Sequence, residues 1–445
     1  MVLLLLWAGS LLGQAPEALE PGVQAEPGAT ALEGVAELAE PATAGPVSRF
    51  EANLEFDRLV QAEDFEAAAT IGEGWVDLTE QEFGADSLEA GAAHVSLAEA
   101  KTKAGDYAGA EEHYLVAIEI YRDADGLYSG NLVKPLVGLG DSYHLDSEYL
   151  NAVSAYNEAR TVSRRVFGLL NEDQIVILDR MSRSFLNMNE YLEADLQQRE
   201  ALLIVERNHP PESIEVLEAI YRYAAWLRER RLFTPEREQY ARAARIIREH
   251  YGNEHVLMAK PLQETGNSFR TQGAAVGQGI NGLRQALELL EAAPERDAYA
   301  IAAVLRDIGD WQVAFSKVDP NSAEYRRAWQ LLGEVTNGEA LREQWFSGIE
   351  YVFYEVPSNR GLSTATDAST GFVLVKFDLA ASGRTLNVQV LESEPPGFKD
   401  AAMERHVRLS RFRPHMEDGV PVMARNLALQ ITFRYVVDYE AQEAQ

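Results

Sequence analysis

The sequence has 445 residues, a formal net charge of -30 and no cysteine. A chain of this length is too long for one compact core, so two or more structural units are expected. Its negative charge would be repelled by phosphate groups, which argues against binding to nucleic acids or to anionic membranes. The absence of cysteine excludes disulfides, thiolate metal sites and cysteine nucleophiles.

Residues 1–15 have the shape of a secretory signal peptide. An apolar run from Val2 to Gly13 leads into small residues at Gly13 and Ala15, the positions that a signal peptidase reads. The run is shorter than the ~20 apolar residues that cross a bilayer. We therefore expect export, and we keep an uncleaved inner-membrane anchor as the alternative because the segment lacks a positively charged start.

Residues 16–48 consist largely of Ala, Gly, Glu and Pro, with three Glu-Pro pairs. Such a segment cannot bury enough apolar surface to become ordered, so it predicts a flexible spacer. At the other end of the chain, residues 438–445 predict an acidic tail.

Residues 49–344 repeat with a period of 42. One series of core-type positions comprises Leu97, Leu139, Met181, Tyr223 and Thr265, with Ile308 43 residues later. A second series in the same register comprises Phe65, Tyr107, Tyr149, Tyr191 and Phe233. Small residues accompany both series, as at Gly140 and Ala152. Two series in one register indicate a repeat array of about seven units.

This pattern resembles the tetratricopeptide repeat, in which two amphipathic helices pack through small residues. The usual unit has ~34 residues, and a unit of 42 resembles the repeats of kinesin light chains. The resemblance implies an all-α solenoid whose inner face is lined by the first helix of each pair.

Polar residues at spacings of three and four on the first helices would point into the groove of such a solenoid. The predicted groove residues are Lys134, Asp141, His144, Asp179, Arg183, Asn187, Tyr221, Arg228, Lys260, Asn267 and Arg270. These residues predict a site for an extended peptide. The alternative is a solvated helix face without a ligand.

After Trp345 the apolar period changes to two. Apolar residues alternate with polar ones over 373–379 and again over 386–390, with a turn at 381–384, which predicts a β-hairpin with one buried face. A helical stripe follows, made of Phe398, Ala401, Ala402, Leu409 and Phe412 and ended by Pro414. After the turn at Asp418 and Gly419, strict alternation predicts a last strand over 426–435.

Residues 371–435 resemble the C-terminal domain of TonB family energy transducers. The shared features are the Gly-Arg hairpin turn, the Ala-Ala helix, Phe-Arg-Pro at 412–414 and Asp-Gly-x-Pro-Val at 418–422. The resemblance implies a small α+β domain of order β-β-α-β within residues 345–437. It also implies binding of an extended segment of an outer-membrane transporter, which adds as a strand to an exposed sheet edge.

The resemblance makes strand 426–435 the candidate edge. The edge and rim residues are Leu427, Leu429, Ile431, Phe433, Arg411, Arg413 and Arg425. A purely structural role is the alternative for the three arginines.

Two patterns in the sequence resemble motifs of enzymes or metal sites but lack the neighbouring elements or the spacing that those motifs require. Gly277, Gly279 and Gly282 spell G-x-G-x-x-G, but they lie in the helical repeats rather than after a strand, so a turn between helices is expected. His250 and His255 are five residues apart and face different sides of a helix, so a loop or capping role is expected instead of zinc binding. We expect no enzyme activity, cofactor or metal.

The sequence therefore predicts a tetratricopeptide solenoid followed by an α+β domain, in a non-enzymatic interaction protein of the periplasm. Its expected partners are proteins, either outer-membrane transporters or another envelope component, and no nucleic acid. Association with a membrane is expected only through the N-terminus. One alternative is a membrane-anchored energy transducer for outer-membrane nutrient transport, and another is an adaptor without a transport role. No histidine precedes His94, whereas the membrane helix of transducers carries one, which favours the first interpretation. Nothing in the sequence indicates an oligomeric state.

Overall fold

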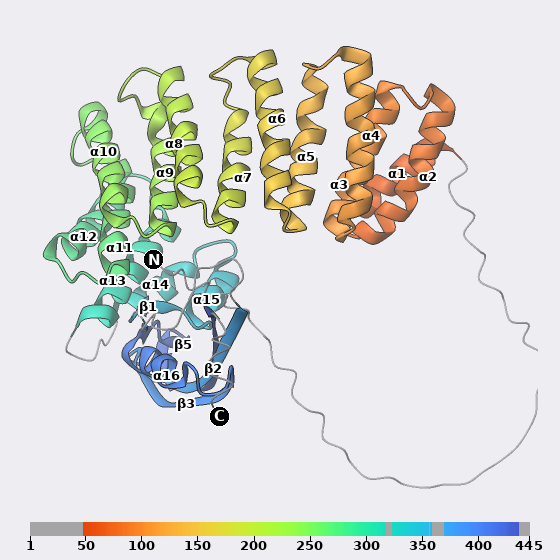
Figure 1. Ribbon diagram of the computed structural model, residues 1–445. Coiled ribbons are helices and arrows are strands. Elements are labelled where there is room, and N and C mark those ends of the chain that lie inside the picture. Colours follow the sequence, from red (N-terminus) through yellow and green to blue (C-terminus); the bar gives the residue numbers. More distant parts are fainter. Residues whose placement is uncertain (1–47, 317–322, 356, 358–368, 436–445) are drawn as a thin grey trace, which may run out of the picture. The chain divides into compact units, whose positions relative to one another are not determined.

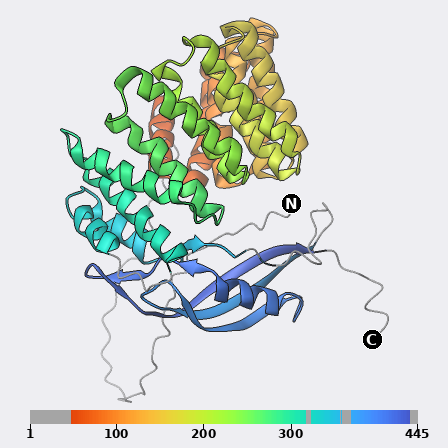
Figure 2. The ribbon, with the colours of Figure 1, turned by 90° about the vertical axis from the view of Figure 1, so that its left-hand side faces the viewer.

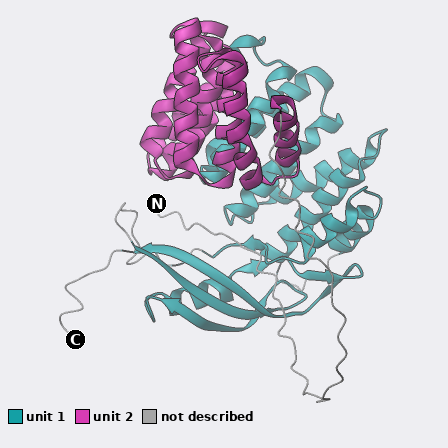
Figure 3. Cartoon of the chain, turned by 90° about the vertical axis from the view of Figure 1, so that its right-hand side faces the viewer, with its two compact units in different colours: residues 1–10, 205–445 teal, residues 11–204 magenta. Residues whose placement is uncertain are grey.

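The computed structural model describes residues 48–316, 323–355, 357 and 369–435. The chain divides into two compact units, one of residues 11–204 and the other of residues 205–445 with residues 1–10 (Figure 3). The predicted signal-like segment, almost all of the predicted spacer and the predicted acidic tail lie outside the described residues.

Residues 48–204 form consecutive helix pairs (Figure 1). The helices are α1 (Arg49–Gln61), α2 (Phe65–Phe83), α3 (Leu88–Ala104), α4 (Tyr107–Asp125), α5 (Val133–Leu145), α6 (Tyr149–Phe167), α7 (Gln174–Asn187) and α8 (Tyr191–Asn208). The last of these carries the boundary between the two units. A short 3₁₀ helix, η1 (Gly130–Leu132), leads into α5.

The residues spaced by 42 occupy equivalent places in successive pairs. The second series begins the second helices, since α2, α4, α6, α8 and α10 start at Phe65, Tyr107, Tyr149, Tyr191 and Phe233. The turn before a second helix holds a residue with positive φ, at positions 63, 105, 147, 189, 231 and 273. The small residues of the second helices, Ala68, Ala110, Ala152 and Ala194, are completely buried. Small side chains there let the two helices of a pair approach closely.

Residues 205–346 continue the helix pairs within the other unit. Its helices are α9 (Leu217–Glu229), α10 (Phe233–Tyr251), α11 (Ala259–Thr271), α12 (Gly277–Ala292), α13 (Ala298–Phe315), α14 (Ala323–Leu332) and α15 (Gly338–Phe346), with the 3₁₀ helices η2 (Ile214–Val216) and η3 (Val256–Met258). The expected turn at the G-x-G-x-x-G motif is wrong, because Gly277 begins α12 and the other two glycines lie inside it. Gly279 faces Trp311 so closely that a Cβ would lie 2.4 Å from the indole ring.

The chain ends in a small sheet domain of the same unit (Figure 2). Its elements are β1 (Tyr351–Phe353), β2 (Ser369–Leu379), β3 (Thr385–Glu394), α16 (Asp400–Leu409), β4 (Arg411–Phe412), β5 (His415–Glu417), β6 (Val420–Val422) and β7 (Ala424–Tyr435). The order β3-β2-β7 forms a three-stranded antiparallel sheet, and the short strands pair as β1-β4 and β5-β6. Alternate residues of β2 and β7 pack with α16 in one core.

Helical repeats followed by a small antiparallel sheet domain confirm the predicted fold class. The predicted stripe of the last helix is partly wrong. Met403, His406 and Val407 are its buried residues, whereas Phe398 and Leu409 are exposed. The helix ends at Leu409, before Pro414, because Arg411 and Phe412 form a strand that pairs with β1.

The hairpin also departs from the prediction on its second strand. Leu386 is exposed and Thr385 is buried, so the apolar face begins one residue off the predicted alternation. The register between β2 and β3 shifts twice, and Asn387 adopts a positive φ at one of these bulges. A bulge places two residues opposite one and so moves side chains to the other face.

Among the described helices, none combines the length and the apolar character needed to cross a bilayer.

Candidate functional site

One candidate binding surface is a hollow of about 920 Å³ in the unit that contains residues 48–204. Its walls come mainly from the first helices α3, α5 and α7. Among these, α3 contacts α5 and α5 contacts α7. Five predicted groove residues line it: Lys134, Asp141, His144, Asp179 and Arg183. Asn187 is exposed near the end of α7 and does not line this hollow.

Asp141 lies at the centre of the polar contacts in this hollow. The hydroxyl of Tyr156 donates a hydrogen bond of 2.7 Å to Oδ1, and Nε of Arg180 lies 2.7 Å from the same oxygen. Burial raises the pKa of Asp141, while Tyr156 and Arg180 act in the opposite direction. Tyr156 and Arg180 therefore offset only part of the free-energy cost of removing the Asp141 carboxylate from water.

Other charged groups surround Asp141. Lys134 pairs with Glu99 at 3.0 Å, and Gln198 donates to Asp179 at 2.7 Å. Nδ1 of His144 lies 2.8 Å from the hydroxyl oxygen of Ser184, and burial lowers the pKa of this histidine. The hollow thus offers side chains of both signs next to the apolar residues that line it.

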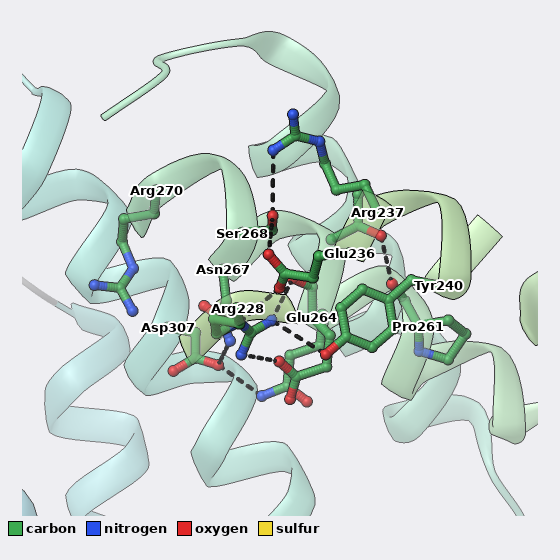
Figure 4. A network of polar contacts seen from close by, with 12 residues as sticks. Arg228, Glu236, Arg237, Tyr240, Pro261, Glu264, Asn267, Ser268, Arg270 and Asp307 are labelled. Carbon is green, nitrogen blue, oxygen red and sulfur yellow. Dashed lines mark hydrogen bonds and ion pairs between the residues drawn. The ribbon is translucent and has the colours of Figure 1, made fainter. Parts of the chain in front are cut away.

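The remaining predicted groove residues lie in the other unit, where most of them contact other groups of the same chain. Nζ of Lys260 stands 4.0 Å from the ring centre of Tyr221, as a cation–π pair. Arg228 lies between Glu236 and Glu264, with N–O distances of 2.6 Å to each (Figure 4). Glu236 is completely buried, and burial raises its pKa while Arg228 opposes the rise.

Asn267 and Arg270 also have partners within the protein. The side-chain amide of Asn267 donates to the buried carboxylate of Asp307 at 2.8 Å (Figure 4). Arg270 donates to the backbone carbonyl of Val352 at 3.0 Å, so it holds the strand that enters the C-terminal domain. The structure brings these residues together as an internal network rather than as an open clamp.

Arg413 is not a rim charge of the sheet. Only 8% of its surface is exposed, and it forms a two-pronged ion pair with Asp310 of α13, at 2.9 Å from Nε and 2.8 Å from Nη2. Its Nη1 donates to the carbonyl of Trp345 at 3.0 Å. Burial alone would raise the pKa of Asp310, but Arg413 and Arg270 hold it well below its ordinary value. The structural alternative therefore applies to this arginine, which fixes the sheet domain to the last helix pair.

The other two predicted rim arginines lie on the sheet domain itself. Arg411 donates to the backbone carbonyls of Leu409 and Ser410, just after α16. Arg425 is exposed near the start of β7. Of the predicted edge residues, Leu429, Ile431 and Phe433 are buried against the core and Leu427 is half-buried. These four side chains face inward, so the outer border of β7 consists of its backbone.

Histidines do not gather into a metal site. Within residues 48–316, 323–355, 357 and 369–435, no three His, Asp or Glu side chains are placed to hold a metal ion. His255 instead accepts a hydrogen bond from the backbone of Leu257 at the start of η3, the expected capping role.

The sequence reasoning missed Asp310 and Tyr156, which organise the polar contacts of the two units. A signal for both exists in the sequence. Gly140-Asp141 is followed by Tyr156, and Gly309-Asp310 is followed by Tyr325, each tyrosine 15 residues after its aspartate. Each aspartate also lies two residues after a member of the first repeat series, Leu139 or Ile308.

Residues 365–435 match the family model of the Gram-negative bacterial TonB protein C-terminal. This match confirms the resemblance of the C-terminal domain. The helix pairs with their 42-residue spacing are tetratricopeptide-like repeats. Both kinds of module mediate interactions between proteins, so the chain is a protein-interaction scaffold.

Three solved structures are among those to which this chain is similar. The kinesin light chain repeats from Podosopora anserina have 13% identity and a TM-score of 0.39, over 45% of this chain and 96% of that chain. BtubC (BKLC) from P. vanneervenii has 15% identity and a TM-score of 0.36, over 59% and 98%. The C-terminal part of a repeat protein from Cytophaga hutchinsonii has 9% identity and a TM-score of 0.38, over 65% and 97%. The search among curated proteins found no match.

Proposed function

We propose that this chain is a non-enzymatic interaction protein of the Gram-negative periplasm, whose C-terminal domain accepts an extended segment of an outer-membrane transporter as an added strand. The signal-like start supports export, and the match of residues 365–435 supports the Gram-negative envelope. The helical repeats supply a second surface for another protein partner.

The border of β7 is the observation that carries this proposal. In the three-stranded sheet β3-β2-β7, each outer strand has one border that pairs with no other described strand. β7 pairs with β2 in unbroken register from Ser369 opposite Tyr435 to Phe377 opposite Leu427. β7 is therefore straight and regular along nine residues, 427–435.

Charge also distinguishes the two borders. No charged residue lies between Arg425 and Arg434 on β7, whereas β3 carries Glu392 and Glu394. β3 is also interrupted by two register shifts. Charges and bulges are the devices by which edge strands avoid pairing with other chains. β3 has both, and the central part of β7 has neither, so β7 is the border that suits strand addition.

A matched pair of variants tests this choice of border. Gln430 and Gln389 are exposed glutamines on β7 and β3, and each pairs with a residue of β2. Gln430→Lys should weaken binding of the full-length protein to synthetic peptides from the N-terminal segments of outer-membrane transporters by several-fold, because a lysine ammonium resists desolvation beside an incoming strand. Gln389→Lys should leave the affinity unchanged.

Fluorescence anisotropy with labelled peptides measures both affinities. Equal effects of the two substitutions, or no binding by the unmodified protein, would argue against strand addition at β7. Circular dichroism serves as the folding control for both variants.

A further inference from the structure

Two histidines lie side by side in the second helix pair, His94 on α3 and His113 on α4. Their Nδ1 atoms are 2.9 Å apart, and their ring centres are 5.1 Å apart. His94 is buried, with 5% of its surface exposed, and His113 is half-buried. A distance of 2.9 Å between two ring nitrogens is that of a hydrogen bond, so one Nδ1 must carry a proton and the other must accept it.

The other nitrogen of each ring faces a carboxylate of α2. Nε2 of His94 lies 3.0 Å from Oε1 of Glu80, and Nε2 of His113 lies 3.6 Å from Oε2 of Glu73. Burial alone would raise the pKa of Glu73, but Lys101 and His113 hold it below its ordinary value. An ionised carboxylate only accepts hydrogen bonds, so both Nε2 atoms need a proton for these contacts to be favourable.

These three contacts together determine how many protons the two rings carry. Each Nε2 needs one proton, and the two Nδ1 atoms need one between them, which makes three. Two neutral imidazoles carry two protons, and two imidazolium ions carry four. The arrangement is therefore complete only when one histidine is charged and the other is neutral.

A fourth proton has no place between the two rings. It would set two N–H groups against each other and would bring two positive charges together. Lys101, which shares Glu73 with His113, adds another positive charge nearby. Burial lowers the pKa of His113, and the charges of His94 and Lys101 act in the same direction, whereas Glu73 opposes them. The charged side chains that face the pair come from all three helices packed around it: Glu73 and Glu80 of α2, Lys101 of α3, and Asp106 at the start of α4.

We propose that the contact between His94 and His113 is a pH-sensitive switch, which holds α3 and α4 together while the pair carries one positive charge and loosens them when it takes up a second. These two helices form part of the hollow described above, through Glu99 and Thr102 of α3 and Tyr114 of α4. The switch therefore acts on the wall of a candidate binding surface.

Acidification should weaken the second helix pair because the unfolded chain binds more protons than the folded one. In the unfolded chain both histidines have pKa values of about 6.5 and are charged at pH 5. The folded pair accepts only one of these two protons. A difference of one bound proton raises the equilibrium constant of unfolding about tenfold for each pH unit. The helix pair should thus open more readily as the pH falls below about 6.5.

Hydrogen exchange followed by mass spectrometry on the full-length protein tests the switch between pH 6.5 and pH 5. The comparison variant is His113→Gln, whose side-chain amide can donate to Nδ1 of His94 or accept from it but does not titrate. Comparing the two proteins at each pH cancels the intrinsic pH dependence of exchange. Relative to the variant, the protection of α3 and α4 in the native chain should fall about tenfold over this range. The ratio for α12 and α13, which belong to the other unit, should stay constant.

Two results would overturn the proposal. One is a constant ratio in α3 and α4, and the other is a fall of the same size in α12 and α13. His94→Gln is a second variant, which removes the other half of the pair and should abolish the pH dependence in the same way if His113→Gln does not fold. The pair lies on α3 and α4, outside the sheet domain, so its failure would leave strand addition at β7 in place.

Discussion

The third and seventh helix pairs use one arrangement of Gly, Asp and Tyr for two different purposes. In the seventh pair, Asp310 is closed off by Arg413 and anchors the sheet domain. In the third pair, Asp141 contacts Tyr156 and Arg180, remains 32% exposed and lines a hollow. The comparison shows how a repeat array can bury one such aspartate in an ion pair with a distant domain while another stays partly exposed to solvent.

The largest expected effect concerns the buried ion pair between Arg413 and Asp310, which fixes the sheet domain to α13. Arg413→Ala leaves the buried Asp310 with Arg270 at 3.6 Å and the hydroxyl of Tyr325, and removing one partner of a buried ion pair costs about 3–5 kcal/mol. Arg411→Ala, which removes bonds to two backbone carbonyls near the surface, should cost less than about 1 kcal/mol. Urea unfolding of the full-length variants measures both. If Arg413→Ala lowers the free energy of unfolding no more than Arg411→Ala does, the ion pair with Asp310 does not hold the sheet domain in place.

The glycines should give the next largest effects. Gly140→Ala and Gly309→Ala force a methyl group against a buried tyrosine ring, and such overpacking costs about 1–3 kcal/mol. The control is Gly74→Ala in the middle of α2, where no atom lies within 4 Å of the added methyl. That change should stabilise the protein by about 0.5–1 kcal/mol, because alanine favours the helix. Thermal unfolding that shows the same sign for all three variants would contradict this packing.

Removing the tyrosine hydroxyls should produce smaller losses that differ between the two pairs. Tyr325→Phe takes a donor from a carboxylate with no exposed surface, whereas Tyr156→Phe takes one from a carboxylate that water still reaches. We expect a loss of about 1–2 kcal/mol for Tyr325→Phe and about 0.5–1 kcal/mol for Tyr156→Phe. Urea unfolding of each variant provides the values, and a larger loss at Tyr156 would reverse the comparison.

The two aspartates should also show opposite pH dependences. The folded-state pKa of Asp310 is lowered, so its ionised form stabilises the protein at neutral pH and this contribution is lost as the pH falls below about 4. The folded-state pKa of Asp141 is raised, so its ionised form opposes folding at neutral pH and protonation relieves this as the pH falls toward 4.

These contributions are measured as the difference in the free energy of unfolding between the native chain and the variants Asp141→Asn and Asp310→Asn at each pH. Between pH 7 and pH 4 the native chain should gain stability relative to Asp141→Asn. Between pH 4 and lower pH it should lose stability relative to Asp310→Asn. Hydrogen exchange of α5 and α13 separates the two units, and parallel pH curves for both aspartates would remove the distinction between them.

Periodicity predicted the repeats because their contacts are local. Leu97, Leu139 and Met181 are buried as their spacing requires, and the aromatic residues of the second series begin helices in register. The alternation in residues 427–433 likewise places Leu429, Ile431 and Phe433 in the core. Both patterns follow from the geometry of one element and its immediate neighbour.

Contacts between distant parts of the chain had no such signal. The pairing of Arg413 with Asp310 joins residues 103 positions apart, and nothing in the local pattern distinguishes Arg413 from the exposed Arg425. The end of α16 at Leu409 depends on β1, more than 50 residues earlier, which offers a pairing partner to β4. For the groove, sequence spacing identified Asp141 and Arg270, but Arg270 contacts the backbone carbonyl of Val352 in the sheet domain and Asp310 in α13.

Hydrogen exchange followed by mass spectrometry on the full-length protein tests strand addition most directly. The measurement compares the free protein with the protein bound to synthetic peptides from the N-terminal segments of outer-membrane transporters. We expect amide exchange to slow over residues 427–433 of β7, while β3 stays unchanged. Unchanged exchange in β7, or protection confined to β3, would contradict the proposed function.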